Sequence, residues 1–271
     1  MLKTRITTGA VITVIMTLVI IFSHIPWLLN TMIAALSVQA IFELFRATKL
    51  KDRKALYIFS CIAAMLISFV AIPGMNYIVV VLFATTISLF TYLMLNLKNT
   101  IRIQPWMTVY IGLIIPFFFK SMSSIRQMDN GVYLLGVAIL VPVVTDIAAY
   151  FVGKNLGKHK LAPVISPKKT IEGSIGGVVY AMAIILLIAM LLQRFGVVSI
   201  NLKVMIAYVL TASIVGQFGD LAMSSIKRIV GIKDYGKLLP GHGGILDRFD
   251  SMLFVMPFTY LFCILCGTMI Y

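Results

Sequence analysis

The sequence predicts an all-α, polytopic integral membrane protein with about nine transmembrane helices and a polar site that faces the cytoplasm. Its 271 residues are 61% hydrophobic and 12% charged, and the mean hydropathy is +1.03. Such a chain is expected to contain apolar stretches of about 20 residues, the length that crosses about 30 Å of hydrocarbon. The basic residues also gather on one side of the predicted spans. Together these features exclude a soluble domain longer than a loop.

Apolar stretches predict the spans in order along the chain. No residue between Ile6 and Phe42 is charged, and a single helix of that length would be about 55 Å long. We therefore place a break at His24-Ile25-Pro26. The predicted spans cover residues 7–23, 27–45, 55–72, 76–96, 106–119, 131–151, 174–193, 203–223 and 251–270.

The spans divide the chain into two predicted regions. Residues 1–130 hold about five spans, and residues 131–271 hold the other spans with two long polar loops, 152–173 and 224–250. Of the 23 Lys and Arg residues, 19 fall on the side of these loops and of the N-terminus. The other four are Lys120, Arg126, Arg194 and Lys203. Because basic loops stay in the cytoplasm, we expect the N-terminus inside and the C-terminus outside.

The net charge of +14 predicts anionic partners such as lipid headgroups or phosphates. This charge sits in short loops between spans, so we do not expect a nucleic acid as a partner. The excess of basic loops fits a bacterial inner, or cytoplasmic, membrane.

Four carboxylates are expected to converge at the cytoplasmic surface. Asp146 and Asp220 lie in the sixth and eighth spans, where a carboxylate costs about 2.5–3.5 kcal/mol unless it faces a polar interior or a ligand. We place both about one turn from the cytoplasmic ends of their helices. Asp247 and Asp250 enter the ninth span three residues apart, which puts them on one helix face. Oxygen ligands without Cys or His at zinc spacing predict Mg²⁺, with a second cation left open.

The neighbouring basic residues indicate that the metal is accompanied by phosphate. A site for a metal alone would not need Lys168, Lys169, Lys227, Arg228, Lys233 and Arg248 around it. The Ser166-Pro167 pair predicts the N-cap and first position of a helix that starts near Lys168, and a helix N-terminus favours phosphate. We also expect Gly236, Gly241, Gly243 and Gly244 to let backbone N–H groups approach phosphate. The chain contains neither GxxxxGK[ST] nor GxGxxG, which excludes a conventional nucleotide-binding domain.

These residues form a pattern that resembles the signature of the CDP-diacylglycerol synthases, also called phosphatidate cytidylyltransferases. The stretch "TDIAAYFVGKNLGKHKLAPVISPKKTIEGSIGG" resembles the same family, and the likeness covers roughly residues 140–250. The matching positions are Ser224-Ser225-Ile226-Lys227-Arg228, Lys233-Asp234, Gly236, Leu239-Pro240, His242-Gly243-Gly244-Ile245 and Asp247-Arg248-Phe249-Asp250. The resemblance implies that CTP and phosphatidate react with a divalent metal to give CDP-diacylglycerol and pyrophosphate. It also implies an integral-membrane homodimer.

This reaction suggests a role for each candidate residue. We expect Asp220 and Asp247 to bind the metal, with Asp146 and Asp250 as further ligands or neighbours of the ligands. The residues expected to neutralise the triphosphate and its leaving group are Lys227, Arg228, Lys233 and Arg248, with His242 donating to a phosphate oxygen or shaping its loop. The residues expected to bind substrate are Ser166, Lys168, Lys169, Ser224, Gly243 and Gly244.

Two other functions are compatible with parts of this pattern. A CTP-dependent lipid-alcohol kinase also needs a metal–phosphate site in the membrane, but its product would be CDP. An anion or lipid-phosphate transporter usually binds its substrate near the bilayer midplane between repeated halves, and this sequence shows no repeat. Asp234 is left open as a metal ligand or an ion-pair partner of Lys233.

Overall fold

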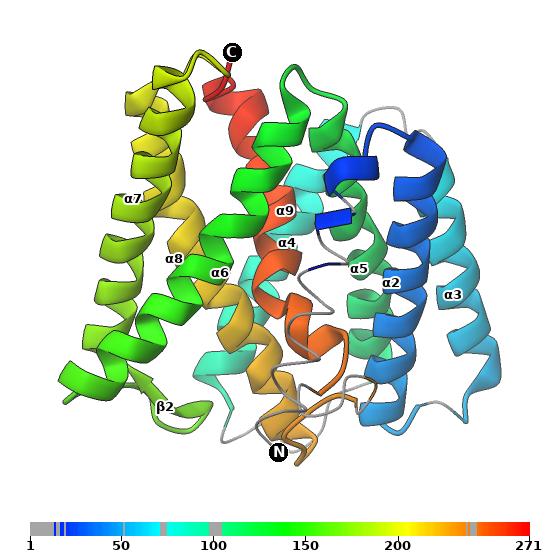
Figure 1. Ribbon diagram of the computed structural model, residues 1–271. Coiled ribbons are helices and arrows are strands. Elements are labelled where there is room, and N and C mark those ends of the chain that lie inside the picture. Colours follow the sequence, from blue (N-terminus) through cyan, green and yellow to red (C-terminus); the bar gives the residue numbers. More distant parts are fainter. Residues whose placement is uncertain are drawn as a thin grey trace.

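The protein is a helical bundle with one small β-hairpin at one end (Figure 1). The structure, a computed structural model, describes residues 14, 17–18, 20–50, 52–70, 75–97, 105–236, 238 and 243–271. Its elements are α2 (Pro26–Ala47), α3 (Lys54–Phe69), α4 (Met75–Leu95), α5 (Pro105–Arg126), α6 (Gly131–Leu156), β1 (Lys160–Ala162), β2 (Ser166–Thr170), α7 (Ile171–Arg194), α8 (Leu202–Ile229) and α9 (Leu246–Cys266).

The all-α prediction is confirmed, and eight of the predicted spans each have a helix. Seven of these helices within the described residues are long and apolar enough to cross a membrane. The exception is α3, whose 16 residues fall short of the about 17 that a spanning helix needs. The first predicted span, residues 7–23, lies largely outside the described residues.

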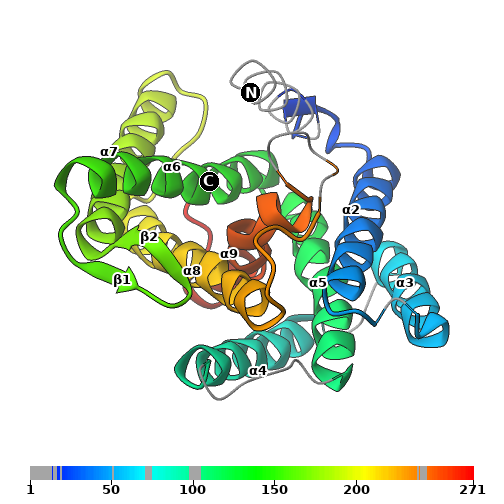
Figure 2. The same cartoon turned by 90° about the horizontal axis from the view of Figure 1, so that it is seen from below.

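Helix α9 lies at the centre of the bundle, with α8, α6, α5 and α4 around it (Figure 2). Aromatic rings fill the space around α9. The Phe254 ring is 5.7 Å from the Phe90 ring and 6.0 Å from the Phe118 ring, both edge to face. Such a packed centre fixes where the polar end of α9 stands relative to its neighbours.

Helices α8 and α9 approach closely because α8 has a glycine at the contact. A Cβ atom on Gly219 would lie 2.8 Å from Cδ2 of Phe254 and 2.9 Å from the carbonyl oxygen of Asp250. No larger residue fits there without moving a backbone. The close approach brings Asp220, the next residue of α8, beside Asp250 of α9.

The predicted helix start near Lys168 is wrong. Residues Ser166–Thr170 form strand β2, which pairs antiparallel with β1, and helix α7 begins at Ile171. Thr170 has an extended backbone and caps α7, because its Oγ1 accepts a hydrogen bond from the Gly173 N–H at 3.1 Å. The fixed φ of Pro167 suits a strand as well as a first helical turn, so the Ser-Pro pair alone does not decide between them.

The intramembrane carboxylates lie deeper in their helices than predicted. Asp146 precedes the end of α6 at Leu156 by ten residues, and Asp220 precedes the end of α8 at Ile229 by nine. At about 1.5 Å per residue, these carboxylates are more than two turns from the helix ends. Both helices continue past the apolar spans through polar residues such as Lys154 and Lys227. Both carboxylates line a polar pocket that the ends of these helices enclose.

Candidate active site

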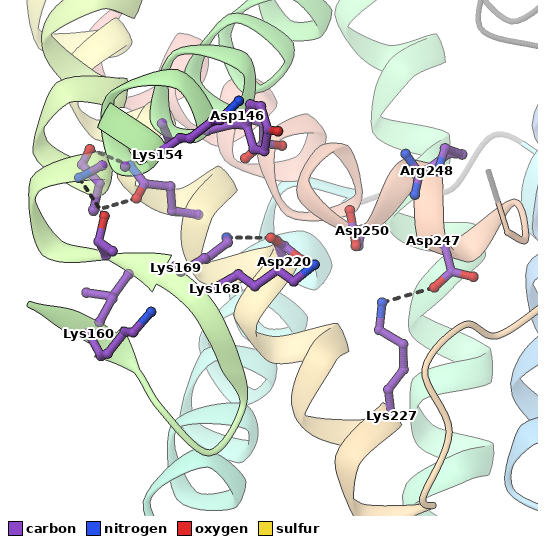
Figure 3. A pocket seen from close by; sticks show the side chains of 18 of the residues that line it. Asp146, Lys154, Lys160, Lys168, Lys169, Asp220, Lys227, Asp247, Arg248 and Asp250 are labelled. Carbon is purple, nitrogen blue, oxygen red and sulfur yellow. Dashed lines mark hydrogen bonds and ion pairs between the residues drawn. The ribbon is translucent and has the colours of Figure 1, made fainter. Parts of the chain in front are cut away.

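A polar cavity of about 700 Å³ opens at the hairpin end of the bundle. Its walls come from α6, the hairpin, α7, α8 and α9, and charged side chains of both signs face it (Figure 3). Eight of the predicted site residues line the cavity together: Asp146, Lys168, Lys169, Asp220, Lys227, Asp247, Arg248 and Asp250. The convergence of the two polar loops and the two intramembrane carboxylates is therefore confirmed.

The lysine of the hairpin nearest the membrane helices is paired with a carboxylate of α8. Lys169 forms an ion pair with Asp220, and their side chains are 25% and 23% exposed (Figure 3). Beyond this ion pair, the described residues offer the Lys169 ammonium no hydrogen-bond partner. Burial alone would lower the pKa of Lys169, but the carboxylates of Asp220 and Asp146 raise it above its ordinary value. Lys169 therefore carries a positive charge at neutral pH.

Asp250 and Asp146 extend the negative side of the cavity. Asp250 is 9% exposed and accepts a hydrogen bond from the Ser251 N–H at 2.9 Å. Asp146 accepts one from the Ser251 hydroxyl at 3.1 Å. Asp146 comes from α6, Asp220 from α8 and Asp250 from α9. Three membrane helices thus contribute one carboxylate each to the surroundings of the Lys169 ammonium.

Asp247 is engaged differently from the other three carboxylates. Its Oδ1 accepts a hydrogen bond from Lys227 Nζ at 2.9 Å, and its Oδ2 accepts from the N–H groups of Tyr235 at 2.7 Å and Gly244 at 2.9 Å. The Asp247 and Lys227 side chains are only 2% and 9% exposed. The Lys227 ammonium also lies 5.4 Å from the centre of the Tyr235 ring. Asp247 therefore holds the described part of the α8–α9 loop against both helices.

Other predicted residues lie outside the cavity wall. Arg228 donates through Nε to the Ile165 carbonyl at 2.8 Å and so ties α8 to the hairpin. Ser224 donates to Asp220 Oδ1 at 3.3 Å. Lys233 is exposed on the loop, and Ser166 begins β2.

Four further predicted residues belong to the glycine-rich loop. The N–H of Gly244 donates to Asp247, while Gly243 has a left-handed φ of 89°. His242 and Gly241 lie outside the described residues. The phosphate-binding roles of these residues, and the metal-binding role of Asp247, stay predictions.

Several residues of the site were missed by the sequence analysis. Lys154 and Lys160 line the cavity, although neither was assigned to the site. Gln217 also lines it, where its side chain accepts a hydrogen bond from Ser174 at 2.5 Å. Lys154 and Lys160 are six residues apart, and this spacing alone does not predict that both side chains face one cavity. The hairpin that brings Lys160 to the cavity was not predicted.

The fold and the cavity define a polytopic membrane protein whose site, rich in lysine and carboxylate, is suited to phosphate. The chain belongs to the cytidylyltransferase family, whose model matches residues 3–266. It is therefore an enzyme of the nucleotidyltransferase class.

The chain is similar to curated proteins of two bacterial genera. It is 38% identical to a phosphatidate cytidylyltransferase of Bacillus subtilis over 96% of both chains. It is 44% identical to a phosphatidate cytidylyltransferase of Staphylococcus aureus over 55% of this chain and 53% of that one. A protein of the same name from Staphylococcus haemolyticus is 43% identical over the same shares.

The Lys227–Asp247 pair should be required for stability. In Lys227→Met a deeply buried carboxylate loses its counter-charge, which we expect to cost about 3–5 kcal/mol of unfolding free energy. Thermal unfolding of the purified protein in detergent measures this loss. The exposed cavity residue Lys160 supplies the matched control, and Lys160→Met should unfold near the wild-type temperature. An unchanged midpoint for Lys227→Met would contradict the importance of the pair.

Proposed function

We propose that this protein is a phosphatidate cytidylyltransferase, which converts CTP and phosphatidate into CDP-diacylglycerol and pyrophosphate for phospholipid biosynthesis. The observation that carries the proposal is the cavity, where carboxylates of three membrane helices meet lysines of the hairpin. The similarity to a phosphatidate cytidylyltransferase across 96% of the chain supports the same reaction.

The proposed reaction is an in-line attack of a phosphatidate oxygen on the α-phosphorus of CTP, with pyrophosphate as the leaving group. A phosphate monoester has its second pKa at about 6, so the phosphatidate nucleophile is already largely ionised at neutral pH. A strong general base is therefore unnecessary. The main obstacle is the repulsion between two polyanions, and fixed cations reduce it.

The basic residues of the cavity are placed to meet this repulsion. Lys168 and Lys169 reach the cavity from the hairpin, whereas Arg248 reaches it from α9. We assign these three cations to phosphate groups of the two substrates. Lys169 is held beside Asp220, so its charge is fixed in position before the substrates bind.

We further propose that Mg²⁺ binds at this site. Magnesium is usually held by one or two carboxylates together with substrate phosphates and water. Within the described residues, no three acidic, His or Cys side chains are grouped to hold a metal by themselves, so the phosphates of CTP would complete the set. Asp220 and Asp250 fit this requirement, with Asp146 beside them. The ion pair of Asp220 with Lys169 supports this assignment, because a positive group already lies against the same carboxylate. Bound magnesium would neutralise phosphate charge.

The protein is proposed to lie in a bacterial inner membrane with this cavity open to the cytoplasm, and to form a homodimer. The segregation of Lys and Arg supports this orientation. The lipid would then enter sideways between helices, while CTP arrives from the cytosol.

A cysteine at Lys158, beside the hairpin, tests the orientation. In a background without the three native cysteines, Lys158→Cys should resist a membrane-impermeant thiol reagent in intact cells and react after lysis. Gly196→Cys, in the turn after α7 at the other end of the bundle, should react in intact cells. The reverse pattern would place the cavity outside. Crosslinking of the purified protein in detergent checks the dimer, and a single-chain mass throughout would contradict it.

Purified protein with CTP, phosphatidate and Mg²⁺ should form CDP-diacylglycerol and pyrophosphate in equal amounts. Asp220→Asn should lower kcat on the order of 10²- to 10³-fold, because it removes charge that orders the cations of the site. Asp129→Asn provides the control, since Asp129 is exposed in the turn between α5 and α6. Mass spectrometry of the lipid and an enzymatic pyrophosphate assay measure both products. Release of CDP in place of pyrophosphate would contradict the proposal.

A further inference from the structure

The buried carboxylate of Glu43 contacts the α8–α9 region from the N-terminal half of the chain. Glu43 is on α2 and is 1% exposed. Its Oε1 accepts hydrogen bonds from the Ile245 N–H and from Gln39 Nε2, both at 3.0 Å, and its Oε2 accepts from the Leu246 N–H at 2.9 Å. A buried carboxylate with these partners serves a specific structural purpose, because an unpaired one would be costly.

These contacts cap the N-terminus of α9. The residue before the helix is Ile245, which has no side-chain group to accept hydrogen bonds from the first turn. Glu43 supplies the missing acceptors from another helix, and its negative charge faces the positive end of the helix dipole. Asp247 accepts a hydrogen bond from the Gly244 N–H. Together, Asp247 and Glu43 therefore accept from the three successive N–H groups of Gly244, Ile245 and Leu246 at the start of α9.

The glycines of this segment make room for Glu43. A Cβ atom on Gly244 would lie 2.3 Å from Glu43 Oε2, and one on Gly236 would lie 2.6 Å from Glu43 Oε1. Arg46, one turn further along α2, donates to the Tyr235 carbonyl at 3.3 Å. Helix α2 therefore holds the chain at two points before α9: Arg46 binds at Tyr235, and Glu43 binds at Ile245 and Leu246.

The first two turns of α9 also carry side chains of the cavity. Asp247, Arg248 and Asp250 all line it, whereas Glu43 does not. Any shift in the start of α9 would move these three side chains relative to Asp220 and Lys169. Glu43 is thus connected to the cavity only through the backbone that it holds.

We infer that Glu43 is a positioning residue, which anchors the start of α9 and thereby sets Arg248 and Asp250 in the geometry that the reaction needs. The inference about catalysis rests on the proposed function, while the anchoring does not. Glu43 touches no reacting atom in this account.

The experiment compares Glu43→Gln and Glu43→Ala with the wild type. Gln keeps one carbonyl acceptor and the size of the side chain, so it should fold even if Ala does not. Ser37→Ala is the matched control, because Ser37 is also buried on α2 but bonds to Ile33 of its own helix at 2.7 Å. Hydrogen exchange followed by mass spectrometry reports on residues 243–250, and steady-state kinetics report kcat and KM for CTP and phosphatidate.

In Glu43→Gln we expect exchange in residues 243–250 to accelerate on the order of tenfold to hundredfold, the effect of losing a charged hydrogen bond. Exchange in α4 and α6 should stay unchanged. The same variant should lower kcat about tenfold, with a larger fall in Glu43→Ala, while Ser37→Ala retains wild-type values. This graded loss of kcat, with a local change in exchange, is not expected from general destabilisation.

Two results would overturn the inference. Unchanged exchange in residues 243–250 would show that Glu43 does not anchor α9. Faster exchange with wild-type kcat would show an anchor that does not position the site. If the wild type formed no CDP-diacylglycerol, the proposed function would fail, and the exchange measurement would still decide whether Glu43 anchors α9.

Discussion

The arrangement of the site depends on the buried ion pair between Asp247 and Lys227. A charge inside a membrane bundle must be compensated, because its loss of hydration costs several kcal/mol. Asp247 is compensated by one ammonium and two backbone N–H groups, all within 2.9 Å. These partners belong to α8 and to two points of the α8–α9 loop, at Tyr235 and at Gly244. One carboxylate of α9 therefore holds α8 and both ends of the described loop together.

The buried carboxylates of the protein divide into two groups by their exposure and partners. Glu43 and Asp247 are almost fully buried and hold backbone amides. Asp220 is 23% exposed and forms an ion pair with Lys169 of the hairpin. The first group holds the backbone at this end of the bundle, while Asp220, like Asp247, lines the cavity where substrates would bind. This division explains how so few acidic residues serve both architecture and chemistry.

The membrane helices and the convergence of the polar residues could be predicted from the sequence. Apolar length predicts spans directly, because hydrocarbon thickness sets it. The cost of a carboxylate in a span likewise marked Asp146 and Asp220 as residues facing a polar interior. The β-hairpin could not be predicted in the same way, since Ser166-Pro167 suits either a strand or a helix start. The depth of Asp146 was misjudged because α6 continues through polar residues beyond its apolar stretch.

Glu43 was missed although it carried the same signal as Asp146. It stands at the end of a long uncharged stretch, inside the predicted span 27–45, but was given no role. Its partners are more than 200 residues away in the sequence. Every residue other than proline has a backbone N–H, so the sequence does not indicate which of them bind Glu43. Only the three-dimensional structure reveals these partners. The same applies to Asp247, whose acceptors serve the loop as well as Lys227.

The most direct test follows each phosphate of CTP separately. Purified protein in detergent receives phosphatidate, Mg²⁺ and CTP labelled at either the α- or the γ-phosphate. The account predicts that α-label enters the lipid and that γ-label is released as pyrophosphate. Transfer of γ-label to the lipid would identify a kinase and contradict nucleotidyl transfer in this cavity.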